Sequence, residues 1–462
     1  MSTRTRRATT ALALALPLAL VAACADPDTT GDEAAGAAAP SDTAAAGTDA
    51  AGEATEVQAR TPRLAVTYDG GVKILDAQTL EEVGDVELAG FNRLNPLGDG
   101  RHLAVSTTGG FQVLDLGTWG QGHDDHHHWF TAAPALTDVT YAATTPGHVV
   151  VHDGVTAFFD DGTGTVQLVA SADAPTAGAA VETVELPAAH HGVAVPLDDD
   201  TLVVTEGTED ERTGIRVLDA AREEIAASDE CPGVHGETVA ADEVVVVGCT
   251  DGALVVDDGT IAKVDTPDDY SRIGNQAGTP VSPIVLGDYK TDPDAELERP
   301  TRVSLVDTRD AGIRLVDLPA SYTFRSLARG DDGEALVLTT DGALQVIDPE
   351  SGEITASIPV IEPWEEPTEW QDARPAVLAL DGSVYVTDPA TDSIHAVDLV
   401  DQEVWLSGEI GVTPNEINGV TGLPEADGHE HADEHDHEAD ADEHDHEADE
   451  ADEDDHEDDH DH

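Results

Sequence analysis

The feature that most constrains the fold is an internal repeat between residue 62 and about residue 422. Short Val/Leu/Ile/Ala runs recur at a spacing of roughly 40–50 residues, and they begin near Leu64, His102, His148, Thr201, Glu243, Pro283, Glu334 and Pro375. After a turn, a second segment of recurring form follows, as in GVKILDAQT, GFQVLDLGT, GIRVLDAAR, GALVVDDGT, GIRLVDLPA, GALQVIDPE and SIHAVDLVD. Strand-length segments separated by Asp-Gly and Gly-Gly turns, without long helical periodicity, indicate an all-β chain.

A repeat of this length with four short strands is typical of a β-propeller blade. We therefore predict a β-propeller over residues 61–423 with eight blades, or seven if residues 270–310 are an insertion. The first unit lacks an inner strand before Pro62, and Thr413–Gly422 could supply that strand and close the ring. Two β-sandwiches are the alternative, which the regular period disfavours.

The N-terminus has the pattern of an export signal. Arg4, Arg6 and Arg7 precede an apolar segment that is too short to span a bilayer, and Val21-Ala22-Ala23 leads directly to Cys24. This pattern resembles the lipobox of bacterial lipoproteins, which predicts a signal peptide over residues 1–23 and lipidation of Cys24. Cleavage after an Ala-x-Ala-like site of an ordinary secretory signal is the alternative. Residues 24–60 have almost no large apolar side chain and are predicted to be a disordered linker.

The charge limits the partners that the protein can bind. With 96 acidic and 21 basic residues the formal net charge is -75, so a nucleic-acid backbone would be repelled. Such a surface suits an exported protein that attracts cations.

Two cysteines remain after Cys24. Cys231 and Cys249 lie at the edges of one repeat unit, and in an exported protein this pair is expected to form a disulfide. Metal-binding or catalytic thiols are the alternative, because His235 follows Cys231 closely.

Histidine is concentrated in the C-terminal tail, residues 424–462. Nine of the 20 histidines lie there: His429, His431, His435, His437, His444, His446, His456, His460 and His462. Imidazoles interleaved with carboxylates favour zinc, or nickel, cobalt or Cu(II), whereas Cu(I) is disfavoured because the only methionine is the initiator. We predict a disordered metal-binding tail; a charged solubilising tail is the alternative.

A second group of histidines lies in the segment GQGHDDHHHWF. His123 and His126, with His127 or His128 and one of the two aspartates, could complete four-coordination on a loop anchored by Trp129 and Phe130. A polar surface loop with incidental histidines is the alternative.

A third group is defined by equivalent positions in successive repeats. His191 and His235 each precede a glycine at the start of a strand, so they could share an ion beside the central channel, and His190 could also contribute. Turn or capping roles are the alternative. We expect His102, His148, His152 and His395, in strand-like segments, to be structural.

The segments GHDDHHHWF, HHGVAVP and CPGVHGE, together with a histidine-rich extension, resemble the AztD zinc metallochaperones. The resemblance covers residues 62–422 and implies zinc binding outside the cytoplasm. It also implies transfer of zinc to the solute-binding protein of a zinc ABC importer, and it assigns zinc binding to His123, His126 and His128, with His191 and His235 as further candidates. The long acidic tail and the lipid anchor depart from that pattern and put its delivery mechanism in doubt.

We therefore predict an extracytoplasmic, lipid-anchored zinc metallochaperone that is not an enzyme, since the sequence has no G-x-S-x-G motif. A passive divalent-metal reservoir, a metal-dependent propeller hydrolase and a protein-interaction scaffold are the alternatives.

Overall fold

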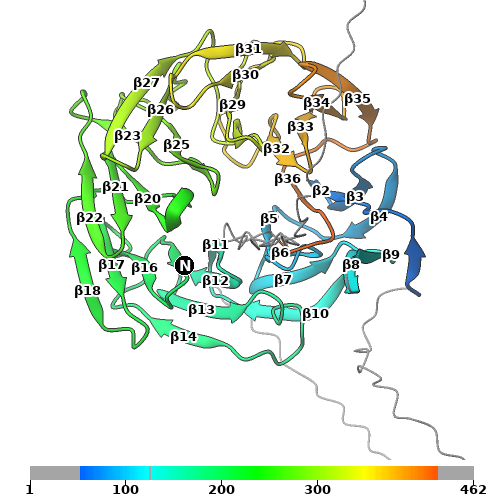
Figure 1. The fold of residues 1–462 in the computed structure, drawn as a ribbon, viewed down its shortest axis with the longest axis horizontal. Helices are drawn as coiled ribbons and strands as arrows, with labels where there is room; N and C mark the ends of the chain where they lie inside the picture. The colour runs from blue at the N-terminus through cyan, green and yellow to red at the C-terminus, as the bar shows by residue number, and fades with distance from the viewer. Residues whose placement is uncertain (1–52, 124–125, 425–462) are drawn as a thin grey trace, which may run out of the picture. The chain divides into compact units, whose positions relative to one another are not determined.

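The structure, a computed structural model, describes residues 53–123 and 126–424. Within these residues eight antiparallel sheets surround a common centre as the blades of a propeller (Figure 1). The predicted all-β propeller is confirmed, with eight blades rather than seven. Its described part also contains one short 3-10 helix, η1 (Ala241–Glu243). No helix in the described ranges has the length and apolar character that a membrane span needs.

Each blade has four strands, which are named in order from the innermost to the outermost. Blades 1 and 2 are formed by β36 (Ile417–Val420), β2 (Arg63–Tyr68), β3 (Gly71–Asp76) and β4 (Glu82–Glu87), then by β5 (Arg93–Pro96), β6 (His102–Thr107), β7 (Gly110–Asp115) and β10 (Ala135–Ala142). Blades 3 and 4 are formed by β11 (Pro146–His152), β12 (Val155–Asp160), β13 (Thr165–Ala170) and β14 (Glu182–Glu185), then by β15 (Ala194–Pro196), β16 (Leu202–Gly207), β17 (Arg212–Leu218) and β18 (Glu224–Ser228).

The other four blades follow the same order. Blades 5 and 6 are formed by β19 (Glu237–Val239), β20 (Val245–Cys249), β21 (Asp251–Asp257) and β22 (Thr260–Val264), with the short β23 (Ser271–Arg272) beside β21, then by β24 (Gln276–Thr279), β25 (Ser282–Asp288), β26 (Arg302–Asp307) and β27 (Gly312–Asp317). Blades 7 and 8 are formed by β28 (Leu327–Arg329), β29 (Ala335–Leu338), β30 (Ala343–Ile347) and β31 (Ile354–Pro359), then by β32 (Val377–Leu380), β33 (Ser383–Asp388), β34 (Ser393–Asp398) and β35 (Glu403–Glu409).

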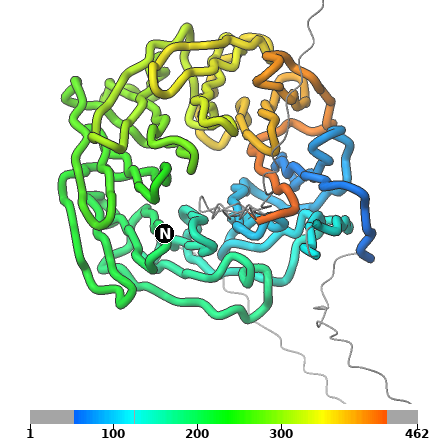
Figure 2. Tube along the Cα trace, viewed as in Figure 1, coloured from blue at the N-terminus to red at the C-terminus, as the bar shows by residue number. Residues whose placement is uncertain are grey.

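The two ends of the propeller domain meet in blade 1. β36 pairs antiparallel with β2, with Arg63 opposite Val420 and Val66 opposite Ile417. Figure 2 shows this last strand lying beside the first strands of the chain. The predicted closure by Thr413–Gly422 is therefore confirmed, and the backbone groups of β2 are paired on both sides, so that β2 presents no open sheet edge.

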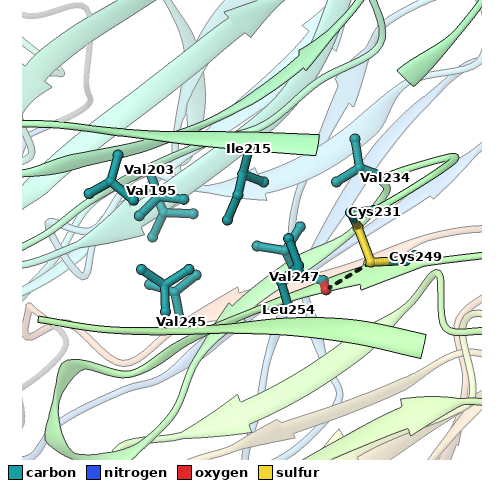
Figure 3. Close-up of a cluster of buried hydrophobic side chains, with 11 residues drawn as sticks. Val195, Val203, Ile215, Cys231, Val234, Val245, Val247, Cys249 and Leu254 are labelled. Carbon is teal, nitrogen blue, oxygen red and sulfur yellow. Dashed lines mark hydrogen bonds between the residues drawn. A yellow bond between two sulfur atoms is a disulfide. The ribbon is translucent and has the colours of Figure 1, made fainter. Parts of the chain in front are cut away.

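Burial differs between inner and outer strands because the blades pack face to face. The middle strands β2 and β3 are buried over five consecutive residues, whereas the outermost strand β35 alternates exposed and half-buried residues. Each core cluster joins two neighbouring blades, as in Figure 3, where Val203 and Ile215 of blade 4 lie in one buried cluster with Val245 and Val247 of blade 5. The middle strands therefore need continuous apolar runs, because both of their faces are buried. The outer strands need apolar residues only at alternate positions.

The recurring Gly…Asp segment has a structural cause at each end. A Cβ on Gly71, which opens β3, would lie 2.4 Å from the Val86 carbonyl oxygen of the outer strand, so only glycine fits. At the other end, the Asp76 carboxylate accepts hydrogen bonds from the backbone N–H groups of Gln78 (2.9 Å) and Thr79 (3.0 Å), which forms the tight turn into β4.

The repeat is less regular in space than in sequence. Gly312–Asp317, which carries the recurring segment, is the outermost strand β27, and the third strand of blade 6 is β26. The runs near His148 and Pro375 similarly lead into the innermost strands β11 and β32 rather than second strands. The long connection between β25 and β26, residues 289–301, displaces the pattern in blade 6. Residues 270–310 therefore contain blade 6 strands.

One additional sheet lies outside the blades. β8 (Thr118–His123) and β9 (His126–Thr131) form a hairpin inserted between β7 and β10, and β1 (Thr55–Val57) pairs with β9. The histidine segment is therefore a β-hairpin and not a loop. Strand structure also begins before the expected boundary at residue 61, because β1 satisfies the free edge of β9.

Candidate metal centres

Three histidines from consecutive blades meet at the channel, and we call them the channel trio. His148 lies on β11, whereas His191 and His235 precede β15 and β19. One nitrogen of each ring lies within 4.8 Å of the corresponding nitrogens of the other two. The Nε2 atoms of His148 and His191 are 3.3 Å apart. Such a set offers three imidazole ligands to one ion and leaves a fourth position open.

Each ring of the channel trio is oriented through its Nδ1 atom. The Nδ1 of His235 donates to the Gly274 carbonyl oxygen at 2.7 Å, and that of His191 lies 2.6 Å from Asp161 Oδ2. The Nδ1 of His148 lies 3.3 Å from Glu237 Oε1. Because these acceptors hold the proton on Nδ1, the Nε2 lone pairs are available to a metal, as in the second shell of zinc sites.

A glycine beside the channel trio leaves space for one of these hydrogen-bond acceptors. A Cβ on Gly147 would lie 2.1 Å from Asp161 Oδ1, so glycine is needed for the carboxylate to reach His191. The carboxylates of Asp161 and Glu237 lie beside the rings of His191 and His148 and would offset the charge of a bound divalent cation.

The electrostatics favour neutral imidazole at His235 and protonation at His148. Burial, together with the neighbouring His148, lowers the pKa of His235 to about 2. Burial also acts to lower the pKa of His148, but the Glu237 carboxylate outweighs it, and the net direction is upward. Of these two rings, His148 therefore takes up a proton before His235 does.

Replacing Asp161 with asparagine tests whether its carboxylate orients the ring of His191 for metal binding. An amide in place of the carboxylate holds the Nδ1 proton less strongly, so we expect zinc affinity at the channel trio to fall about 10–100-fold. Competition with a chromophoric chelator measures the change. Asp138→Asn, at an exposed position of β10, is the matched control and should leave the affinity unaltered; equal effects of the two changes would contradict the assignment.

His148 and His190 have surroundings that differ from those expected from the sequence. His148 was expected to be structural, yet it completes the channel trio. The signal that could have found it is the blade period, because His148 and His191 are 43 residues apart and His235 follows one blade later. His190 is instead buried, with its Nδ1 2.9 Å from the Ala188 carbonyl oxygen and its Nε2 3.0 Å from Thr205 Oγ1.

The other strand histidines have non-metal partners, as expected. His152 Nε2 lies 2.7 Å from Glu243 Oε2, and His102 contacts Asp99 and Asp115. His395 lies between the hydroxyls of Ser393 and Ser407.

A second group, which we call the hairpin trio, consists of His123, His126 and His128. His123 and His126 are opposite each other at the ends of β8 and β9, and the Nε2 atoms of His126 and His128 are 3.3 Å apart. One nitrogen of each ring lies within 4.8 Å of the other two. His123 and His126 are exposed and His128 is half-buried, so ions here can exchange readily with solvent.

Strand alternation explains which histidines of the hairpin meet. His127 points to the opposite face of β9 from its neighbours and stacks on Trp129, with ring centroids 5.5 Å apart. Glu56 of β1 places Oε1 2.7 Å from His128 Nδ1, a partner that the sequence did not reveal. Asp124 and Asp125 lie outside the described residues, as do Cys24 and the nine tail histidines.

The two trios lie at opposite ends of the blades. Successive strands of a blade run antiparallel, so the start of an innermost strand and the end of a third strand lie at opposite ends of the propeller. His191 and His235 precede innermost strands, whereas the hairpin follows the third strand β7. They therefore form two separate candidate sites.

The predicted disulfide is confirmed, and it helps to fix the segment that carries His235. Cys231 and Cys249 are bonded, with Cα atoms 4.9 Å apart and both side chains buried (Figure 3). The backbone N–H of His235 donates to the carbonyl oxygen of Gly248, next to Cys249, at 2.9 Å. The segment carrying His235 is thus fixed to β20 by a covalent and a hydrogen bond.

Known proteins share both the sequence pattern and the fold. The zinc chaperone AztD of Citrobacter koseri is 28% identical over 265 residues, which cover 55% of this chain and 61% of AztD. A crystal structure of Citrobacter koseri AztD superposes with a TM-score of 0.68 at 25% identity, covering 78% of this chain and 98% of that one. The chain is AztD-like in sequence and fold. A structure of apo AztD from the same organism gives a TM-score of 0.67 at 25% identity, with 79% and 100% covered. The sequence match to AztD spans about three fifths of that relative's length, and no protein-family model matches the chain.

Proposed function

We propose that this protein is an extracytoplasmic zinc metallochaperone that passes zinc to the solute-binding protein of a zinc ABC importer. The observation that carries the proposal is the channel trio, whose rings are pre-oriented by Asp161, Glu237 and the Gly274 carbonyl. The AztD relative is named a zinc chaperone, and this name supports the non-enzymatic role expected from the sequence.

The geometry suggests how zinc is released to a partner. An acceptor side chain would enter the open fourth position first, and it would then replace one histidine at a time. His191 is the natural first leaving ligand, because its side chain is 41% exposed against 18% for His148. Stepwise ligand exchange keeps the ion bound throughout and needs no nucleophile.

The test is a transfer assay with a zinc solute-binding protein in excess chelator. Zinc-loaded protein is expected to load the acceptor faster than free zinc in the same chelator does. His235→Ala should abolish this advantage, whereas His395→Ala, which alters a ring held by two serine hydroxyls, should keep it. Loss of all zinc to the chelator in the unaltered protein would support the passive reservoir instead.

Zinc affinity should fall as the pH decreases. A raised pKa means that His148 gains its proton above the ordinary histidine value, so competition begins near neutrality and grows between about pH 7.5 and 5.5. His235, with a pKa of about 2, stays neutral over that range. Chelator competition at several pH values measures the effect, and Glu237→Gln should move the loss to lower pH. A constant affinity would contradict imidazole ligation.

A metal-dependent hydrolase is the second candidate, because three imidazoles with an open position are also the ligand set of hydrolytic zinc enzymes. This candidate predicts turnover of lactones or esters by the zinc-loaded protein and loss of turnover in His235→Ala.

The location and the membrane anchor belong to the same proposal. The Cys231–Cys249 disulfide is consistent with an oxidising compartment outside the cytoplasm. Lipidation of Cys24 and removal of residues 1–23 remain predictions for a part of the chain outside the described residues, and metabolic labelling with a fatty acid in the Cys24→Ser variant would test them.

A further inference from the structure

A cavity in the central channel lies beside the channel trio. It has a volume of about 230 Å³ and is lined by residues of blades 1, 2, 6, 7 and 8, at or near the starts of their innermost strands. The trio comes from the other three blades. One lining residue, Asn275, directly follows Gly274, whose carbonyl oxygen accepts the hydrogen bond of the His235 ring at 2.7 Å. The cavity and the trio are therefore neighbours at one end of the channel.

Two arginines share one carboxylate in the wall of this cavity. Glu416 Oε1 accepts hydrogen bonds from Arg93 Nε at 3.2 Å and from Arg325 Nη2 at 3.0 Å. Two guanidinium groups and one carboxylate leave one positive charge uncompensated in this network. At physiological ionic strength exposed charges more than about 8 Å away are largely screened, so this local excess can attract an anion although the whole chain is acidic.

The guanidinium of Arg93 is the accessible one of the two. Its side chain is 48% exposed, whereas that of Arg325 is only 7% exposed. Among the described residues the one hydrogen-bond partner of the Arg93 side chain is Glu416, through Nε, so the N–H donors of both Nη groups are left for a ligand. The planar donor fork of a guanidinium matches a carboxylate or a similar oxyanion.

Arg93 also acts on the channel trio. Burial and the charge of Arg93 both act to lower the pKa of His148, against the carboxylate of Glu237. A guanidinium within electrostatic range of His148 repels a divalent cation at the trio in the same way. An anion between the two positive charges would remove this repulsion, and an ion held by three imidazoles has an open fourth position for such a ligand.

From this arrangement we propose that the channel cavity binds a carboxylate group, which pairs with Arg93 and takes the open fourth position of zinc at the channel trio. The inference rests on the proposed zinc function and adds the class of ligand that the site takes besides the ion. Two sources offer this chemistry, a free small carboxylate and an acidic side chain of the zinc acceptor. In both cases the negative charge lies between zinc and Arg93, so zinc and the carboxylate should each strengthen the binding of the other.

The test uses the full chain, with zinc and acetate as the probes. Zinc affinity is measured by competition at constant ionic strength and increasing acetate, with enough chelator to keep zinc off the hairpin trio and the tail histidines. The chelator is calibrated at each acetate concentration. With acetate at ten times its dissociation constant for the zinc-loaded protein, we expect zinc affinity to be about tenfold higher, since the gain follows 1 + [L]/Kd.

Arg93→Gln should lose this gain. Without acetate it should bind zinc at least as tightly as the unaltered protein, because a repelling charge has been removed. The buried Glu416 keeps its ion pair with Arg325 in this variant, so the channel wall is retained. Arg309→Gln is the matched control, because it removes one positive charge from an exposed position paired with Asp307 and Glu350, and it should keep the gain.

Three outcomes would overturn the inference: no rise of zinc affinity with acetate in the unaltered protein, an equal rise in Arg93→Gln, or weaker zinc binding by Arg93→Gln without acetate. Zinc transfer in carboxylate-free buffer distinguishes the two sources. Slower transfer from Arg93→Gln than from Arg309→Gln assigns the carboxylate to the acceptor, and equal rates assign it to a free small molecule. The proposed function fails separately, if the unaltered protein transfers no zinc to the acceptor.

Discussion

Replacing His235 with alanine is expected to lower zinc affinity at the channel trio by more than about a hundredfold, since loss of an outer-shell partner alone costs about 10–100-fold. His235 is the ring that remains neutral at every relevant pH, because burial and His148 lower its pKa to about 2. Its removal leaves two imidazoles from different blades, one fewer than the three protein ligands of an open zinc site.

Chelator competition measures this loss, with enough chelator to keep zinc off the hairpin trio and the tail histidines. His395→Ala is the control, because its ring contacts the hydroxyls of Ser393 and Ser407 in blade 8. An affinity within a few-fold of the unaltered protein in His235→Ala would remove the channel trio as the principal site.

Removing the disulfide by Cys231→Ala/Cys249→Ala should destabilise the protein by about 2–5 kcal/mol. The bond closes a loop between residues 18 apart in sequence and lies fully buried between blades 4 and 5. Its loss frees the segment that carries His235, which is otherwise held by the 2.9 Å hydrogen bond to Gly248. We therefore expect weaker zinc binding as well as a lower free energy of unfolding.

Val247→Ala separates the two effects. Val247 belongs to the same core cluster as the two cysteines, so its truncation removes packing without releasing the His235 segment. Chemical denaturation and chelator competition on both variants give the comparison. Equal loss of zinc affinity in the two variants would show that the disulfide acts only through general stability.

Much of the fold could be predicted because its causes are local. Gly71 and Asp76 mark the two ends of a blade strand. The Val86 carbonyl leaves no space for a Cβ at Gly71, and the Asp76 carboxylate accepts hydrogen bonds from the N–H groups of the following turn. Comparable constraints recur in blades 4 and 7, where Gly214 and Gly342 lie against backbone carbonyl oxygens and the Asp219 and Asp348 carboxylates accept turn N–H groups. The strand order of blade 6 could not be predicted in this way, because its recurring segment lies on the outermost strand β27, after a long connection between β25 and β26.

The sites were predicted less completely. His123, His126 and His128 were proposed from one segment, and alternation along β9 separates His128 from His127. Glu56 could not be foreseen, because its strand pairs with β9 across a sequence separation of 72 residues. His148 was overlooked since nothing in its own segment differs from a structural histidine.

The amino-acid sequence by itself determined the strand repeat, the chemistry of imidazole and carboxylate, and the pairing of Cys231 with Cys249, because each is written in local pattern and residue type. Only the tertiary structure decided which histidines share a centre. His148, His191 and His235 belong to three blades. Their imidazoles converge because closure of the propeller brings the innermost strands together around one channel.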